Sequence, residues 1–164
     1  MLIVGDSLAF GMQPFLGEML GGRVLTWDVV RGRTTPNGMR ALRIALLTLH
    51  PQTVVISLGT NDGPDPRRFS NRVRRTLRSV PDACIVWPTI WRPRRKGAYR
   101  GLNRVLRREA RRDPRLTVVD WDRTVSKKTV VLPDGLHPSV PSYRVRSSLV
   151  AVAVVRGCVA APPS

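Results

Sequence analysis

The feature that most constrains the fold is a repeated alternation of short apolar runs with longer amphipathic stretches. Each apolar run is rich in β-branched residues and nearly free of polar ones, which is typical of parallel strands covered by helices on both faces. The five runs predicted to be strands are Leu2–Val4, Val24–Val30, Thr53–Leu58, Cys84–Pro88 and Leu116–Asp120.

Helical patterns fill the segments that separate and follow these runs. The first helix is predicted to begin after Ser7 and to stop at the glycine pair 21–22, because glycine commonly ends helices. The second is predicted to start at Thr35 and Pro36, where Thr caps the helix and Pro takes its first position. The predicted helices cover about residues 7–20, 35–50, 69–80, 99–112 and 142–155.

Strands and helices that alternate in this way predict an α/β fold, a three-layer α/β/α sandwich with a central, mostly parallel five-stranded sheet. The 164 residues fit one domain, which we expect to cover residues 1–158, with a flexible tail at 159–164. Right-handed crossovers bring every strand-to-helix loop to one edge of such a sheet, and ligands bind there. We therefore look for chemistry in those loops.

The loops due at that edge carry the groups that acyl transfer requires. Ser7 is a weak nucleophile until a base activates it, and His137 can be that base, because an unperturbed imidazole has a pKa near neutrality. Asp134 can accept the other ring N–H and fix the tautomer of the imidazole. A tetrahedral intermediate also needs hydrogen-bond donors, and the amides of Ser7 and Gly32 and the side chain of Asn61 are suitable.

Each of these residues also has a purely structural interpretation. Ser7 is a good helix N-cap, Asn61 suits a turn, and Gly32 suits a backbone position of unusual φ. We favour catalysis because the partner groups are expected at one edge of the sheet. By contrast, we expect His50 to be structural, at a helix end on the opposite edge, and Asp6 to bond loop amides beside the serine.

Four sequence blocks resemble the SGNH (GDSL-type) hydrolases, in the family's order and over essentially the whole chain. They are GDS at 5–7 with Gly11, the isolated Gly32, GTND at 59–62 and DGLHP at 134–138. No G-x-S-x-G elbow is present, which argues against the α/β-hydrolase fold. The segments VVDW at 118–121 and WPTIWRP at 87–93 look most like bacterial members related to the SGNH domains of cell-envelope acetyl-transfer proteins.

By this resemblance Ser7 is the nucleophile, Asp134 and His137 complete the catalytic triad, and Gly32 and Asn61 complete the oxyanion hole with the Ser7 amide. The resemblance implies a serine ester hydrolase that forms an acyl-enzyme on small or carbohydrate-linked acyl esters, without a metal or other cofactor. One alternative is an acyl or acetyl transferase to a cell-envelope glycan. Another is a basic polyanion-binding protein with a vestigial hydrolase site.

Other residues near the expected site are open to two interpretations. Trp91 follows the fourth strand and either walls the substrate pocket or packs structurally. Arg31 and Arg33 flank Gly32, where an acidic substrate group is conceivable, but we expect them to be solvated. The basic run 92–96 is expected to be a flexible, solvated loop, with contact to an anionic ligand as the alternative.

The charge balance is extreme, with 28 Lys and Arg residues against 11 Asp and Glu and a formal net charge of +17. Nearly all of the positive charge is arginine, which is typical of a GC-rich genome. Such a charge attracts polyanions, yet arginines on solvated faces account for it without a dedicated site. We therefore expect no specific nucleic-acid partner.

The two cysteines, Cys84 and Cys158, have no metal-binding spacing, and the only two histidines cannot complete a plausible zinc site. We expect two free, buried thiols. The alternative is a disulfide, because both residues are due at the edge opposite the active site, and it would imply an oxidising compartment.

No apolar stretch approaches the roughly 20 residues that cross a bilayer, and no charged leader precedes a longer apolar segment. We therefore expect a monomer without a transmembrane segment. The visible sequence favours the cytoplasm, whereas a leader removed upstream would place the protein outside it or in the cell envelope.

Overall fold

The five apolar runs form one parallel sheet in the computed structural model, which describes residues 1–93 and 97–158. The strand order is β2-β1-β3-β4-β5, and each neighbouring pair is parallel. The predicted α/β fold is therefore confirmed. The strands are β1 (Leu2–Gly5), β2 (Thr26–Val29), β3 (Thr53–Ser57), β4 (Cys84–Pro88) and β5 (Leu116–Val119).

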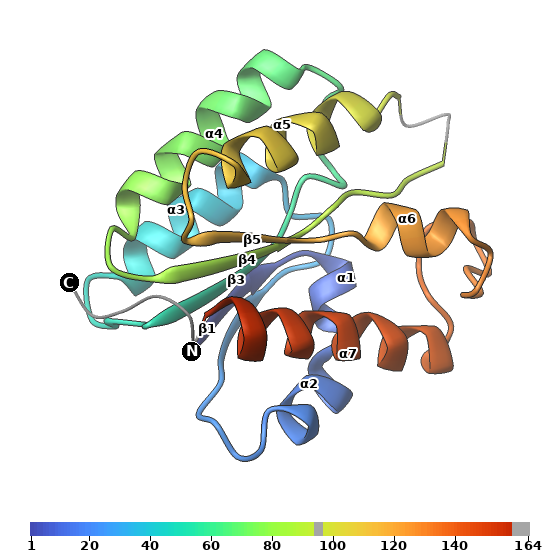
Figure 1. Cartoon of the computed structure of the whole chain (residues 1–164), viewed down its shortest axis with the longest axis horizontal. Coiled ribbons are helices and arrows are strands. Elements are labelled where there is room, and N and C mark those ends of the chain that lie inside the picture. The colour runs from blue at the N-terminus through green and yellow to red at the C-terminus, as the bar shows by residue number, and fades with distance from the viewer. Residues whose placement is uncertain (94–96, 159–164) are drawn as a thin grey trace.

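Helices cover both faces of the sheet, so that the molecule has three layers (Figure 1). One face carries α3 (Thr35–Ala45), α4 (Pro66–Ser79) and α5 (Arg100–Ala110), and the other carries α1 (Ser7–Phe10), α2 (Gln13–Met19) and α7 (Val140–Gly157). None of the helices in the part of the chain that the structure describes has the length and apolarity needed to span a membrane.

Each face of the sheet has its own hydrophobic core, and successive residues of a strand pack into alternate cores. In β1, Leu2 and Val4 pack with apolar side chains of α3, α4 and α5, whereas Ile3 packs with those of α2 and α7. This alternation follows from the pleat of a strand, whose successive side chains point to opposite faces. Because both faces are covered, no position of the central strands is free for a solvated side chain, and the runs are continuously apolar.

The helices differ most from the prediction in three places. The first predicted helix is divided into α1 and α2, because a ring at Pro14 clashes with a helical carbonyl four residues earlier, at Phe10, where α1 ends. The second ends at Ala45, several residues before Pro51. A short helix that was not predicted, α6 (Trp121–Ser126), follows β5.

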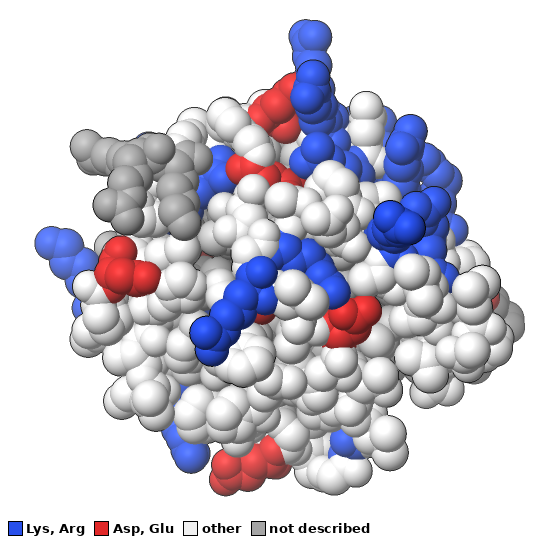
Figure 2. All heavy atoms as spheres, turned by 180° about the vertical axis from the view of Figure 1, so that it is seen from behind, with Lys and Arg blue, Asp and Glu red and all other residues white. Residues whose placement is uncertain are grey.

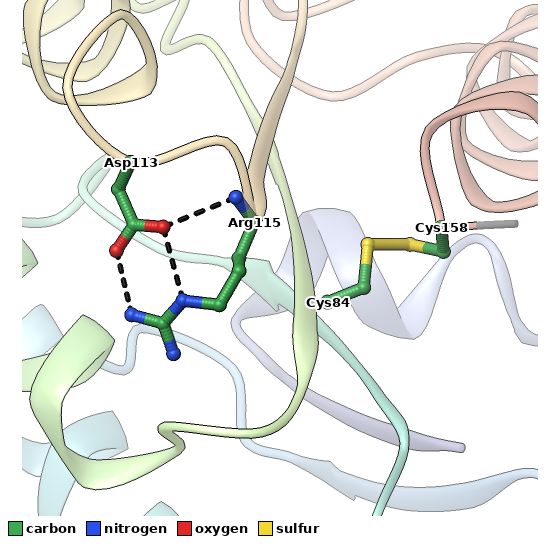
Figure 3. The surroundings of a disulfide bond; sticks show 4 residues. All are labelled: Cys84, Asp113, Arg115 and Cys158. Atoms are coloured by element: carbon green, nitrogen blue, oxygen red, sulfur yellow. Dashed lines mark hydrogen bonds and ion pairs between the residues drawn. A yellow bond between two sulfur atoms is a disulfide. The ribbon is translucent and has the colours of Figure 1, made fainter. Parts of the chain in front are cut away.

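A disulfide joins Cys84 to Cys158, so the expectation of two free thiols is wrong (Figure 3). The two Cα atoms lie 5.4 Å apart although 74 positions separate the residues in sequence. Cys84 begins β4 and Cys158 follows the last turn of α7, which runs back over the sheet. The bond therefore lies at the amino ends of the strands, opposite the edge that carries Ser7.

An ion pair reinforces the same end of the sheet. The guanidinium of Arg115 contacts the carboxylate of Asp113 at 2.6 and 3.0 Å, just before β5 begins (Figure 3). Arg115 also donates to the carbonyl of Val80, at 2.8 Å, and to that of Pro81. These bonds tie the end of α4 to the start of β5.

Candidate active site

Ser7 is presented at the point where β1 passes into α1. The N-cap of this helix is Asp6, whose Oδ1 accepts the N–H of Leu8 at 2.9 Å, and Ser7 is the first helical residue. The interpretation of Ser7 as the cap is therefore wrong, and its hydroxyl is left to contact other groups. Gly5 permits this tight turn, because a Cβ there would lie 2.2 Å from the Cβ of Ala9.

The loop before α7 places His137 against this serine. Ser7 Oγ lies 2.9 Å from His137 Nε2, and His137 Nδ1 lies 2.6 Å from Asp134 Oδ2. A serine bonded to an imidazole, itself bonded to a carboxylate, is the arrangement that general-base activation of a hydroxyl requires. Ser7 and His137 are 130 positions apart in sequence, so the fold brings the loop after β1 and the loop before α7 together.

Asp134 organises its own loop. Its Oδ1 accepts the backbone N–H groups of Leu136 and His137 at 2.9 and 2.7 Å, while Oδ2 faces the imidazole. Hydrogen bonds from the His137 ring and backbone hold the pKa of the Asp134 carboxyl well below its usual range. The carboxylate therefore stays ionised at any pH at which the imidazole works as a base.

Trp91 packs against the loop that carries Asp134 and His137. Its indole N–H donates to the carbonyl of Gly135 at 3.1 Å, and its ring contacts that of Tyr99 with centroids 5.4 Å apart. Trp91 is not among the described residues that line the pocket at Ser7. The structure thus places it in a packing position behind Gly135.

An open pocket of about 470 Å³ lies over the Ser7 hydroxyl. It combines polar groups of the segments that follow β1, β2 and β3 and of the loop before α7 with a few apolar and aromatic side chains, which is typical of small-molecule sites. Its lining residues are Ser7, Phe10, Gly11, Arg31, Gly32, Asn61, Leu136, His137 and Tyr143.

The three expected oxyanion donors border this pocket. Gly32 has a φ of +74°, a conformation that favours glycine, and no atom lies near the place of its missing Cβ. Asn61 is oriented by two contacts of its Nδ2, to Asp6 Oδ2 at 3.3 Å and to the carbonyl of Arg33 at 3.2 Å. The amides of Ser7 and Gly32 donate no hydrogen bond to any residue within 1–93 or 97–158.

A buried charged group lies behind the site and was missed in the sequence. Arg146 on α7 is 2 % exposed, donates to Ser57 Oγ at 3.1 Å, and has its guanidinium 4.9 Å from the ring centroid of Trp121. The sequence does hold a signal for its burial. Arg146 lies four residues from Ser142 and from Val150, so that all three share the inward face of α7.

Burial dominates the titration of this region. It raises the pKa of the Asp6 carboxyl to about 6, against the opposing hydrogen bond from Leu8 and the positive charge of Arg146. It lowers the pKa of the Arg146 guanidinium to about 10, which the negative charge of Asp6 opposes. Asp6 accepts the N–H of Leu8 in the first turn of α1, beside the serine, and its other oxygen accepts from the carboxamide of Asn61.

Two arginines that were expected to be solvated are held by the protein. Arg33 makes an ion pair with Asp28 at 2.6 Å, and its side chain is 9 % exposed. Arg92 is 2 % exposed and donates to four backbone carbonyls, including that of Asp62 at 2.5 Å. Both predictions were wrong: Asp28, at the edge strand β2, supplies the acceptor for Arg33, and carbonyls of its own loop and of the loop after β3 supply those for Arg92. The remaining residues of that basic run, 94–96, lie outside the described residues.

Arg31 and His50 are both exposed, as predicted for Arg31. Arg31 is exposed at the rim of the pocket, with its guanidinium 4.7 Å from the ring centroid of Phe10. His50 is exposed and follows α3, at the edge of the sheet away from Ser7.

Comparisons with known proteins bear on the family. Residues 3–145 match the GDSL-like lipase/acylhydrolase family model. No curated protein sequence matches the chain.

Solved structures of similar fold cover nearly the whole chain. The C-terminal catalytic domain of peptidoglycan O-acetyltransferase A from Streptococcus pneumoniae is 19% identical with a TM-score of 0.75, over 95% of this chain and 90% of that one. A psychrotrophic esterase from Pseudoalteromonas sp. is 18% identical with a TM-score of 0.75, over 94% and 96%. A member of the lipolytic G-D-S-L family from Veillonella parvula is 13% identical with a TM-score of 0.78, over 94% and 97%. The likeness establishes the fold, and the family match over most of the chain confirms the resemblance of the sequence blocks: the chain belongs to the GDSL-like lipase/acylhydrolase family.

Proposed function

We propose that the chain is a serine ester hydrolase that acts through a covalent acyl-enzyme. The observation that carries the proposal is the pair of hydrogen bonds that links Ser7 to His137 and His137 to Asp134, at 2.9 and 2.6 Å. This chain of bonds opens onto a pocket that also contains Gly32 and Asn61. Membership of an acylhydrolase family supports the same chemistry.

In the first half of the reaction, Ser7 Oγ attacks the ester carbonyl while His137 Nε2 takes the hydroxyl proton. Asp134 accepts the Nδ1–H bond and stabilises the imidazolium. The amides of Ser7 and Gly32 and the Asn61 carboxamide donate to the oxyanion. The intermediate then collapses, His137 returns the proton to the leaving alcohol, and the acyl group remains on Ser7.

In the second half, water takes the place of the alcohol. His137 removes a proton from the water as its oxygen attacks the acyl carbonyl, and the same donors stabilise the second oxyanion. Collapse expels Ser7 Oγ, which recovers its proton from His137, and the carboxylic acid leaves. No step calls for a cofactor.

To donate to the oxyanion, the Asn61 side chain must give up one of its two present hydrogen bonds. Its contacts with Asp6 and with the Arg33 carbonyl are both long, at 3.3 and 3.2 Å. A negatively charged oxygen is a stronger acceptor than a peptide carbonyl. The oxyanion can therefore replace the Arg33 carbonyl while Asp6 continues to orient the carboxamide.

The direct test is turnover of 4-nitrophenyl acetate by the native chain and by Ser7→Ala. We expect the substitution to abolish turnover and to abolish labelling by a fluorophosphonate, with the label on the peptide that contains Ser7. Ser148→Ala, which removes an exposed hydroxyl of α7, is the matched control and should behave as the native chain. Absence of both Ser7-dependent turnover and labelling would refute the proposal.

Acyl transfer to a cell-envelope glycan is a second candidate that uses the same acyl-enzyme. It is supported by the likeness to a peptidoglycan O-acetyltransferase domain over 95% of the chain and by the openness of the pocket to a large acceptor. An added chitooligosaccharide should then receive the acetyl group faster than water does. Hydrolysis that is unaffected by the acceptor would favour the hydrolase.

A polyanion-binding protein with a vestigial site is less well supported. A vestigial site has no reason to keep the contacts of Ser7, His137 and Asp134 within hydrogen-bond distance. Tight, salt-sensitive binding of DNA without esterase activity would reverse this preference.

A further inference from the structure

The ionisable side chains that line the pocket at Ser7 include basic groups but no acidic ones, among the described residues. Of the described residues that line it, Arg31 and His137 are the ones that can carry positive charge, and no carboxylate is among them. Asp6 lies beneath the pocket and is fully buried, and Asp134 faces His137. A ligand in this pocket therefore meets the Arg31 guanidinium without a competing acidic side chain on the pocket wall.

Arg31 differs from its neighbour Arg33 in having no acidic partner among the residues that the structure describes. Arg33 is bound by Asp28 at 2.6 Å, whereas Arg31 forms no ion pair with any residue in the described ranges. Its guanidinium lies 4.7 Å from the ring centroid of Phe10, which also lines the pocket. A cation–π contact restrains the group without consuming its N–H donors. Those donors are suited to a carboxylate, which arginine binds in a bidentate manner.

The overall charge of the chain acts in the same direction. Basic side chains predominate over acidic ones on the face that Figure 2 shows, and the formal net charge is +17. A field of this sign raises the local concentration of anions at the surface. An anionic substrate is therefore favoured both in its approach and in the pocket.

We propose that Arg31 recognises a carboxylate on the ester substrate, so that the enzyme prefers anionic esters to neutral ones of the same shape. This inference rests on the proposed esterase function and names the substrate class of that site. Arg31 acts here by binding the substrate and takes no part in proton transfer.

The test compares isosteric pairs of esters. On the alcohol side, 4-acetoxybenzoate is paired with 4-acetoxybenzamide; on the acyl side, the 4-nitrophenyl half-ester of adipate is paired with that of adipamic acid. For each pair, the ratio of kcat/KM for the anionic ester to that for the neutral ester is measured in the native chain and in Arg31→Gln. Differences in intrinsic reactivity are common to both proteins and cancel in the comparison.

We expect Arg31→Gln to lower this ratio about fivefold to tenfold in at least one pair, the size expected for a partly exposed, charge-assisted contact. The pair that responds identifies the side of the ester that carries the carboxylate. Arg31→Lys should retain part of the preference, and 0.5 M salt should weaken it in the native chain through screening.

Arg23→Gln is the control for the general field, because it removes one exposed positive charge from the loop that precedes β2. It should leave both ratios unchanged. Equal ratios in the native chain and Arg31→Gln, or an equal loss in Arg23→Gln, would overturn the inference. If none of the four esters shows Ser7-dependent turnover, it is the proposed function that fails.

Discussion

Removal of the Cys84–Cys158 disulfide is expected to lower the free energy of unfolding by about 2–4 kcal/mol. The bond joins residues 74 positions apart, so the unfolded chain loses much conformational freedom when it is cross-linked. For a loop of that length the chain-entropy relation gives about 4 kcal/mol at 25 °C, and measured disulfides commonly contribute less. In a domain of this size, 1 kcal/mol changes Tm by about 2–4 °C, so Tm should fall by roughly 5–15 °C.

The assay is thermal unfolding followed by circular dichroism, for the oxidised chain and for Cys84→Ala/Cys158→Ser. Alanine is chosen at the buried Cys84 so that no hydroxyl is buried without a partner. Reductant should lower the Tm of the native chain toward that of the variant and should leave the variant unchanged. At 25 °C the variant should keep its esterase kcat/KM, because the bond lies at the edge opposite Ser7.

Two results would refute this reasoning. Titration of the denatured, unreduced protein that finds two free thiols would show that the bond does not form. A change in Tm below about 2 °C would show that the cross-link constrains the unfolded chain far less than its length implies.

Three further predictions concern the site. Asp134→Asn should lower kcat on 4-nitrophenyl acetate by about 10³–10⁴, because an amide at this position favours the wrong tautomer of the histidine; the exposed Asp82→Asn is the control, and a loss below tenfold would contradict the orienting role. Asn61→Ala should lower kcat by about 10²–10³ through loss of an oxyanion donor, and a variant affected only in KM would speak against that role. Burial raises the pKa of the Asp6 carboxyl from 3.8 to about 6, so between these pH values the folded state binds more protons than the unfolded state. The free energy of unfolding of the native chain therefore falls as the pH rises through this range. Asp6→Asn should therefore gain stability relative to the native chain between pH 4 and pH 7, by about 3 kcal/mol at most, in urea unfolding at both pH values; a difference that is independent of pH would contradict it.

Helix boundaries were predicted less well than strands, for a local reason and a distant one. Pro14 interrupts the first predicted helix through its own ring, which the sequence shows but the apolar pattern conceals. α3 begins at Thr35 as predicted, but Thr35 is its first residue and not its cap, and the N–H of Thr35 donates to Asp62 Oδ1, from the loop after β3, at 2.7 Å. Periodicity carries no information about such a contact.

The arginines show the same limit more clearly. The dense basic run at 92–96 predicts a solvated loop, yet Arg92 is buried, because its guanidinium donates to carbonyls of the loop after β3 and of Ala98. Arg146 lies on the inward face of α7 beneath Asp6, where composition alone predicts apolar side chains. Whether a charged side chain is solvated depends on acceptors that distant segments bring to it.

The sequence by itself determined the layered α/β fold and the loops in which chemistry was to be sought. It did so because short, β-branched apolar runs between helical patterns are typical of strands covered on both faces, and parallel strands send their following loops to one edge. Only the tertiary structure decided that Asp6 caps α1 in place of Ser7, that the two cysteines are bonded, and that Arg33 is paired while Arg31 has no ion pair within residues 1–93 and 97–158. The disulfide joins residues 74 positions apart, which only the fold brings together. The contacts of Asp6 with Leu8 and of Arg33 with Asp28 are local in sequence, but they depend on side-chain directions that an apolar pattern does not fix.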